Sequence, residues 1–204
     1  MTGMFIAIDG PGGVGKSTVT KAVVAQARAA GIPVHQTREP SDTTLGQLAR
    51  HGTDEYRDMA LACLIAADRY QHQEREIRPA LARGDLVVSD RHVASSLVFQ
   101  VLDGVGRDIV WELNRHADMP DISVVLNARA DVIAQRLSDR GAHSRYEREA
   151  GGTERECALF REAARFLMAS GVRVLQLDAS SAGSEEVART IVTAIKEMWT
   201  RGRS

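Results

Sequence analysis

The stretch Gly10-Pro11-Gly12-Gly13-Val14-Gly15-Lys16-Ser17 decides the fold. It matches the pattern GxxxxGK[ST] at every fixed position. The apolar run Met4–Ile8 precedes it and ends at Asp9, and an apolar periodicity typical of a helix runs from Lys16 to Ala30. A strand, a glycine-rich turn and a helix in this order bring backbone N–H groups and a helix N-terminus around an anion. The stretch therefore predicts a site for a nucleoside triphosphate.

Each residue type in this loop suits phosphate chemistry. Lys16 is expected to neutralise charge on the β- and γ-phosphates, and the Ser17 hydroxyl is expected to ligate Mg²⁺. A glycine-rich turn without a ligand is the alternative, and the flanking strand and helix make it the weaker one. The expected cofactors are ATP and Mg²⁺. The predicted ATP-binding residues are Gly10, Gly12, Gly13, Val14, Gly15, Lys16, Ser17 and Thr18.

Beyond the loop, apolar runs alternate with helical periodicity. Strands are predicted at 4–8, 34–37, 86–90, 122–126 and 172–177, and helices at 16–30, 54–71, 73–83, 92–101, 108–117, 130–140, 153–169 and 184–201. This alternation predicts an α/β sandwich of three layers, of the P-loop NTPase type, in one domain over residues 1–204. Its five-stranded parallel sheet is covered by helices on both faces. Asp9, Arg38, Asp90, Arg91 and Asp178 follow strands, so they are expected to converge on one crevice.

Composition narrows the class of protein. The chain has 26 basic and 27 acidic residues, 44% hydrophobic residues and no apolar run of eighteen. We expect no nucleic-acid partner, no membrane partner and a cytoplasmic location. The two cysteines lack CxxC spacing, and Cys63 lies in an apolar stretch that favours a buried thiol. Only three of the basic residues are lysines; the 23 arginines are good bidentate phosphate ligands, or they simply cover the surface.

Three classes of P-loop protein compete. A GTPase would carry an NKxD motif, and the sequence has none. An ATPase motor usually needs more than 204 residues and a partner surface. A small-molecule kinase must hold two anionic ligands together, and it needs arginines at strand ends besides the loop. Arg38, Arg69 and Arg91 meet that need, so the sequence favours a kinase.

Three further motifs resemble those of thymidylate kinases. Thr37-Arg38-Glu39-Pro40 resembles their TREP segment, and Ala67-Asp68-Arg69 resembles the region that follows. Ser89-Asp90-Arg91-His92, with Ser95-Ser96 and Phe99-Gln100, is similar to their DR[YH]…S…[YF]Q signature. The resemblance covers residues 4 to 195. It implies phosphorylation of dTMP to dTDP, a homodimer, and a helical lid over about residues 138–155.

The resemblance also implies roles for individual residues. Asp90 holds the Mg²⁺–phosphate assembly together with Ser17, and Arg91 clamps the acceptor phosphate. Arg140 and Arg145 of the lid supply charge to the transition state, because the loop carries no arginine of its own. With Lys16 these form the expected catalytic set: Lys16, Asp90, Arg91, Arg140 and Arg145. The expected substrate-binding residues are Asp9, Arg38, Ile65, Arg69, Arg91, Ser95, Ser96 and Gln100.

Two positions depart from the family pattern. Gly12 stands where a carboxylate commonly contacts the sugar 3′-hydroxyl, and Ile65 stands where an aromatic residue often stacks on thymine. Either another group compensates, with Asp9 and Asp42 as candidates, or the preferred substrate is not dTMP. We therefore expect pyrimidine monophosphate phosphorylation, first of dTMP, with a selectivity over other pyrimidine monophosphates of less than about 10³ in kcat/KM. Two alternatives stay open: a kinase for a cytidylate-type or modified-base monophosphate, and a regulatory P-loop ATPase.

Overall fold

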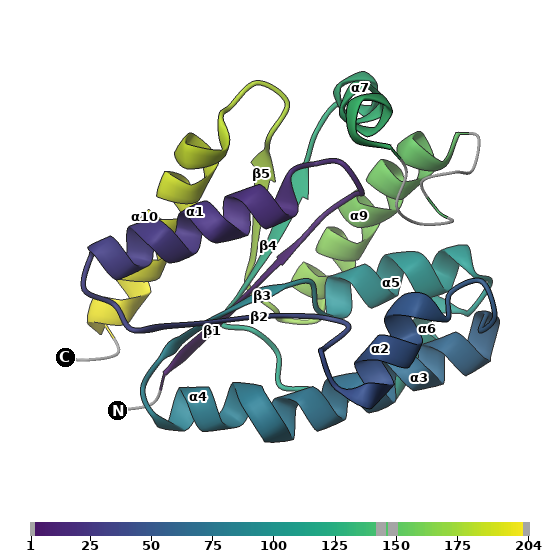
Figure 1. Ribbon diagram of the computed structural model, residues 1–204, viewed down its shortest axis with the longest axis horizontal. Coiled ribbons are helices and arrows are strands. Elements are labelled where there is room, and N and C mark those ends of the chain that lie inside the picture. Colours follow the sequence, from purple (N-terminus) through teal and green to yellow (C-terminus); the bar gives the residue numbers. More distant parts are fainter. Residues whose placement is uncertain (1–2, 142–145, 147–150, 202–204) are drawn as a thin grey trace.

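The computed structural model describes residues 3–141, 146 and 151–201, and Figure 1 shows their arrangement. Five parallel strands form one sheet in the order β2-β3-β1-β4-β5. They are β1 (Met4–Asp9), β2 (Val34–Arg38), β3 (Leu86–Asp90), β4 (Ile122–Asn127) and β5 (Val174–Asp178). The predicted five-stranded parallel sheet is confirmed. The strand that leads into the glycine-rich loop lies at its centre.

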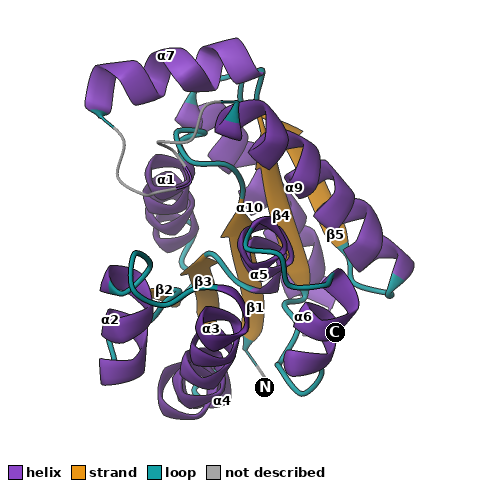
Figure 2. Ribbon diagram, turned by 90° about the vertical axis from the view of Figure 1, so that its right-hand side faces the viewer, coloured by secondary structure: helices purple, strands orange, loops and turns teal. Residues whose placement is uncertain are grey.

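Helices cover both faces of this sheet, as Figures 1 and 2 show. α1 (Lys16–Ala29) and α10 (Ser184–Arg201) pack side by side on one face. The other face carries α4 (Arg78–Ala82), α5 (Val93–Leu102) and α9 (Gly152–Ala169). Three more helices pack on this side: α3 (Asp58–His72) and α6 (Arg107–Leu113) contact α5, and α2 (Thr44–His51) contacts α3. α7 (Ala130–Arg140) lies at the carboxyl edge of the sheet. The predicted three-layer α/β sandwich is confirmed.

Successive side chains of a strand point to opposite faces of the sheet, so the sheet has a hydrophobic core on each face. Ile6, Ile8 and Val88 pack with α1 and α10, whereas Phe5 and Val87 pack against Ile77 and Ala80 of the α4 side. All of these side chains are at most 2% exposed. Strands that are buried on both faces consist of nearly continuous apolar residues, and for this reason they could be recognised in the sequence. None of the described helices is long and apolar enough to span a membrane.

One helical run contains an irregular turn. Residues Gln73–Ile77 (η1) form a π-helical turn between α3 and α4, and the Arg78 N–H bonds to the Gln73 carbonyl five residues back. Pro79 follows within the first turn of α4. Proline has no N–H to give to the carbonyl four residues earlier, so a regular α-helix cannot pass through this point intact. The predicted helix over 73–83 is thus helical but not regular.

Several element predictions were wrong. No helix was expected at α2, the predicted helix at 54–71 begins only at Asp58, the one at 108–117 ends at Leu113, and the strand at 172–177 begins at Val174. The helix α2 was not predicted because Gly46, a residue unfavourable to helices, stands in its first turn. A Cβ atom there would lie 2.1 Å from the Ser41 carbonyl oxygen, so close packing requires the glycine. Cys63, expected to be buried, is exposed because α3 turns Leu61 and Ala62 inward instead.

Candidate active site

The loop between β1 and α1 closes tightly on itself. Gly10 has a φ of +152°, and a Cβ atom there would lie 2.6 Å from the Leu126 carbonyl oxygen, so only glycine fits. Gly15, with a φ of +100°, directly precedes Lys16, the first residue of α1. The first turn of α1 contains no acidic residue. The free N–H groups of this helix end therefore form a cradle for a phosphate anion.

Lys16 supplies the charge of this cradle. Its side chain is buried, and Nζ donates a 2.7 Å hydrogen bond to the Pro11 carbonyl oxygen. Burial, and after it the nearby Arg91 guanidinium, lowers the pKa of Lys16 to about 7, although the Asp90 and Glu156 carboxylates act in the opposite direction. Two neighbouring cations favour an anion between them. Lys16 and Arg91 together are therefore suited to bind a phosphate group.

Ser17 and Asp90 lie together at the carboxyl end of the sheet. The Ser17 hydroxyl donates a 2.8 Å hydrogen bond to Asp90 Oδ2. Within residues 3–141, 146 and 151–201, no group of three or more His, Cys, Asp or Glu side chains could hold a metal ion alone. One hydroxyl and one carboxylate nevertheless fit Mg²⁺, which keeps several waters and takes further ligands from bound phosphates. The predicted metal-binding pair is thus brought together.

A single cavity of about 480 Å³ begins at this loop and extends between α3 and α5. The end of the cavity next to the loop, the phosphate end, is lined mainly by small and cationic residues. The end between α3 and α5, the far end, is lined by apolar and hydrogen-bonding side chains. The phosphate end is lined by Gly12, Gly13, Gly15, Lys16, Ser17, Thr18, Arg38, Asp90 and Arg91. The far end is lined by Leu61, Ile65, Arg69, Ser95, Ser96, Phe99, Gln100 and Tyr146.

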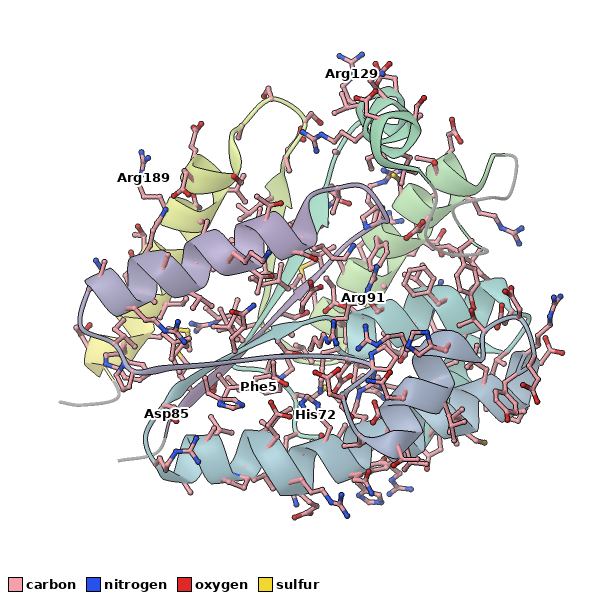
Figure 3. The ribbon with its side chains drawn as sticks, viewed as in Figure 1. Phe5, His72, Asp85, Arg91, Arg129 and Arg189 are labelled. Carbon is pink, nitrogen blue, oxygen red and sulfur yellow. The ribbon has the colours of Figure 1, made fainter. Side chains whose placement is uncertain are left out.

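Arg91 lies between these two ends, near the start of α5 (Figure 3). Its φ of +79° lies in the left-handed region, which is unusual for a residue with a side chain. Nη1 donates to Ser95 Oγ at 3.0 Å and to the Gly10 carbonyl at 3.4 Å, and the guanidinium lies 4.9 Å from the Phe99 ring centroid. Strained backbone and fixed side chain together aim this cation at the phosphate end.

The far end of the cavity presents buried polar atoms. Arg69 is 2% exposed and Gln100 is 4% exposed. The Gln100 Oε1 atom has no hydrogen-bond partner among the described residues. A buried acceptor without a partner is costly, so it indicates a donor on a bound ligand. Ile65 adds an apolar wall.

Comparison with known proteins identifies this arrangement. A sequence model of the family described as Thymidylate kinase matches residues 8–191. The chain belongs to the thymidylate kinase family. It is 38% identical over 149 residues to a probable thymidylate kinase of Caldivirga maquilingensis, covering 71% of this chain and 73% of that protein. It is 37% identical over 161 residues to a thymidylate kinase of Pseudomonas savastanoi, covering 73% and 75%.

Most of the described residues that the sequence placed at the site line the cavity, but Asp9, Gly10, Val14 and Asp178 do not. Asp9 is fully buried, and its Oδ1 accepts hydrogen bonds from the N–H groups of His92 and Ser95. It therefore caps the start of α5 and does not line the cavity. Gly10 and Val14 are buried within the loop. Asp178, expected in the same crevice, hydrogen-bonds Ser180 beyond β5 and does not line the cavity.

Asp42 does not supply the carboxylate missing at Gly12 either. It accepts a 2.5 Å hydrogen bond from Arg38, and with Arg38 it lines a second cavity of about 410 Å³. At the third loop position the Gly12 N–H donates to Glu156 Oε1 at 2.8 Å. Glu156 lies in the second turn of α9, so this helix is fastened to the loop.

The lid prediction falls mainly on residues outside the described part of the chain. Arg145 is among them, and the side chain of Arg140 is not described either, so both stay predictions. The neighbouring Arg136 is described, and it donates 3.1 Å hydrogen bonds to the carbonyls of Val14 and Ala179. Arg136 therefore ties α7 to the loop.

Sequence reasoning missed several residues of the cavity wall. Glu39 and Phe99 stand within the motifs that carried the resemblance, yet they received no role. Arg50 lines the wall from the unpredicted α2 and donates to the Pro40 carbonyl oxygen. Its pKa is lowered, first by burial and then by Arg38. Tyr146 also lines the wall, and its ring centroid lies 4.9 Å from that of Phe99. The sequence around Tyr146 contains no motif that would have predicted this.

Proposed function

We propose that this member of the thymidylate kinase family transfers the γ-phosphoryl group of ATP to dTMP, giving dTDP and ADP. The observation that carries the proposal is the continuity of one cavity. It joins a phosphate cradle at Lys16 to buried hydrogen-bonding groups at Arg69 and Gln100. A nucleoside monophosphate placed along it turns its phosphate toward the loop and its base toward α3. Such free nucleotides fit the cytoplasmic location expected from the sequence.

The residues at the phosphate end meet the needs of phosphoryl transfer. The donor and acceptor phosphates must be held in line, and the charge that spreads over the transferred group must be neutralised. Lys16 approaches this position from the loop and Arg91 from the end of β3. Ser17 and Asp90 would hold Mg²⁺, which neutralises phosphate charge when it is bound. The anionic acceptor needs no general base, so none is assigned.

The residues at the far end favour thymine over cytosine. The Arg69 guanidinium offers N–H donors, and the 4-position of thymine is a carbonyl acceptor. Cytosine carries an amino group there, which places donor against donor and leaves buried groups unpaired. Ile65 lines the same end and packs without stacking. Relaxed selectivity is therefore expected for dUMP, which shares the carbonyl, and not for dCMP or CMP.

A substrate panel tests this proposal. ATP and Mg²⁺ are combined with dTMP, dUMP, dCMP, CMP, AMP and GMP in turn, and ADP formation is measured. We expect dTMP to be phosphorylated best, dUMP within about 10²-fold of it, and dCMP more weakly than either. Preference for dCMP or CMP would establish the cytidylate alternative. ADP released at the same rate without any monophosphate would establish the ATPase alternative.

The lid is tested with Arg140→Ala and Arg145→Ala. Because the loop lacks an arginine, we expect each variant to lower kcat by about 10-fold or more while the KM for ATP changes little. Arg129→Ala is the matched control, since Arg129 pairs with Asp131 at the exposed start of α7. If both lid variants keep kcat within a few-fold of the parent, the lid carries no catalytic charge.

A homodimer, which the family resemblance implies, is the proposed assembly. Leu61, Leu97 and Val98 are fully buried within the protomer and fill its core. The exposed face of α3 carries Met59 and Cys63 instead, four residues apart. Sedimentation is expected to show twice the 22.2 kDa protomer mass, and Met59→Glu is expected to reduce it to one protomer. A parent protein that sediments only as a 22.2 kDa species at micromolar concentration contradicts the dimer.

A further inference from the structure

Three acceptors hold the Arg69 guanidinium from behind. Nε donates to Glu39 Oε2 at 2.8 Å, Nη2 donates to Ser96 Oγ at 3.0 Å, and Nη1 donates to Asn114 Oδ1. The Asn114 amide cannot turn over, because its Nδ2 donates to the Val110 carbonyl at 2.7 Å. These bonds use three of the five N–H groups of the guanidinium. Within the described residues, one N–H on each terminal nitrogen is thus left for a ligand.

The Glu39 contact is unusual because it is single. Arginine and carboxylate commonly form two parallel hydrogen bonds, yet Glu39 gives only Oε2 to Arg69. Its other oxygen, Oε1, lies 3.3 Å from His72 Nδ1 and 3.7 Å from His92 Nε2. Burial lowers the pKa of His92 to about 4, so His92 is neutral at neutral pH. His72 is therefore the cation that engages Oε1.

His72 is itself held firmly. It is fully buried between the sheet and the α3–α4 side (Figure 3), and its Nε2 contacts Thr37 Oγ1 at 2.7 Å and Glu76 Oε2 at 3.4 Å. Burial lowers the pKa of His72, but the hydrogen bonds to Glu39 and Glu76 outweigh it and raise the pKa to about 9. Charges thus alternate from Arg69 through Glu39 and His72 to Glu76, from the cavity to the surface.

We propose that His72, acting through Glu39, is a positioning residue that keeps Arg69 oriented toward the pyrimidine base; this inference rests on the proposed function. While His72 holds Oε1 at 3.3 Å, Glu39 offers only Oε2 to Arg69. Without the imidazolium, Oε1 is free to accept from a terminal nitrogen, in competition with Ser96 and with the ligand. The guanidinium then turns toward Glu39, and its donors no longer match the carbonyl at the 4-position of the base.

The test compares discrimination between bases. His72→Phe removes the hydrogen-bond donor to Glu39 and keeps a ring, and His72→Gln keeps an N–H donor. His35→Phe is the control, because among Arg69, Glu39, His72 and Glu76 the His35 side chain contacts only Glu76. The kcat/KM for dTMP and for dCMP is measured for each, with Kd for both nucleotides by calorimetry without ATP. We expect the dTMP-to-dCMP ratio to fall about tenfold in His72→Phe, through KM and Kd, and less in His72→Gln. His35→Phe is expected to keep the ratio within about twofold.

Other outcomes overturn the inference. If His72→Phe lowers both nucleotides equally and leaves the ratio intact, His72 serves stability alone. An equal loss of discrimination in His35→Phe also contradicts a role through Glu39. A parent enzyme inactive on dTMP refutes the proposed function instead, and the Kd ratio then decides about His72 by itself. If circular dichroism shows that His72→Phe does not fold, Thr37→Val, which removes the 2.7 Å contact with His72 Nε2, takes its place, and its dTMP-to-dCMP ratio is expected to fall while that of His35→Phe does not.

Discussion

Replacing Lys16 with methionine is expected to lower kcat for dTMP phosphorylation by ~10²–10³-fold or more, with the fold intact. Lys16 is the buried cation of the phosphate cradle, and its Nζ atom lies within the loop at 2.7 Å from the Pro11 carbonyl oxygen. Methionine fills similar volume without charge. The variant therefore loses neutralisation of the charge that develops between the β- and γ-phosphates, and it also removes a charge that burial disfavours.

Steady-state rates and thermal unfolding of Lys16→Met are compared with Lys196→Met. Lys196 is exposed on α10, so its replacement is expected to leave both rate and melting temperature unchanged. A Lys16→Met enzyme that turns over at close to the parent rate would disprove the assignment of the loop to phosphate binding.

Arg91→Gln is expected to lower kcat/KM for dTMP by about 10²-fold, with a smaller change in the KM for ATP. Arg91 is held by Ser95 and Gly10 and lines the cavity between its phosphate and base ends. Glutamine keeps the same strained backbone position but has no charge. The acceptor phosphate then meets Lys16 without the second cation that faces it.

Two further variants sharpen this experiment. Arg91→Lys keeps the charge and loses the fork of parallel donors, so it is expected to recover part of the loss. Arg83→Gln changes an exposed arginine that pairs with Asp85, and no loss is expected there. Equal kinetics for Arg91→Gln and Arg83→Gln would show that Arg91 does not clamp the acceptor.

The strands and most helices could be predicted from sequence because their signals are local. The strand at 86–90 and the helix at 130–140 match β3 and α7 at both ends. α2 could not, since the reason for Gly46 lies in its contact with the backbone of Ser41. Propensity describes a residue alone, and close packing depends on what lies opposite.

The candidate site divides in the same way. The loop, Arg69 and Arg91 could be located from motifs, and they line one cavity. Asp9, as a carboxylate at a strand end, was expected to face the ligand, whereas the start of α5 covers the end of the central strand and takes its Oδ1 atom. The contacts of Glu39 with Arg69 and His72 span about thirty residues and leave no pattern in the sequence.

The π-helical turn at Gln73–Ile77 is the point in the α3–α4 run at which a residue can be lost or gained with least disturbance. Its hydrogen bond spans five residues where an α-helical bond spans four, so the turn holds one residue more than an α-helical turn. A deletion of one residue before Ile77 would therefore return this turn to α-helical geometry. Ile77 and Ala80, both fully buried against Phe5 and Val87, would keep their place in the core. Relatives that are one residue shorter in this helical run are expected to have lost that residue here.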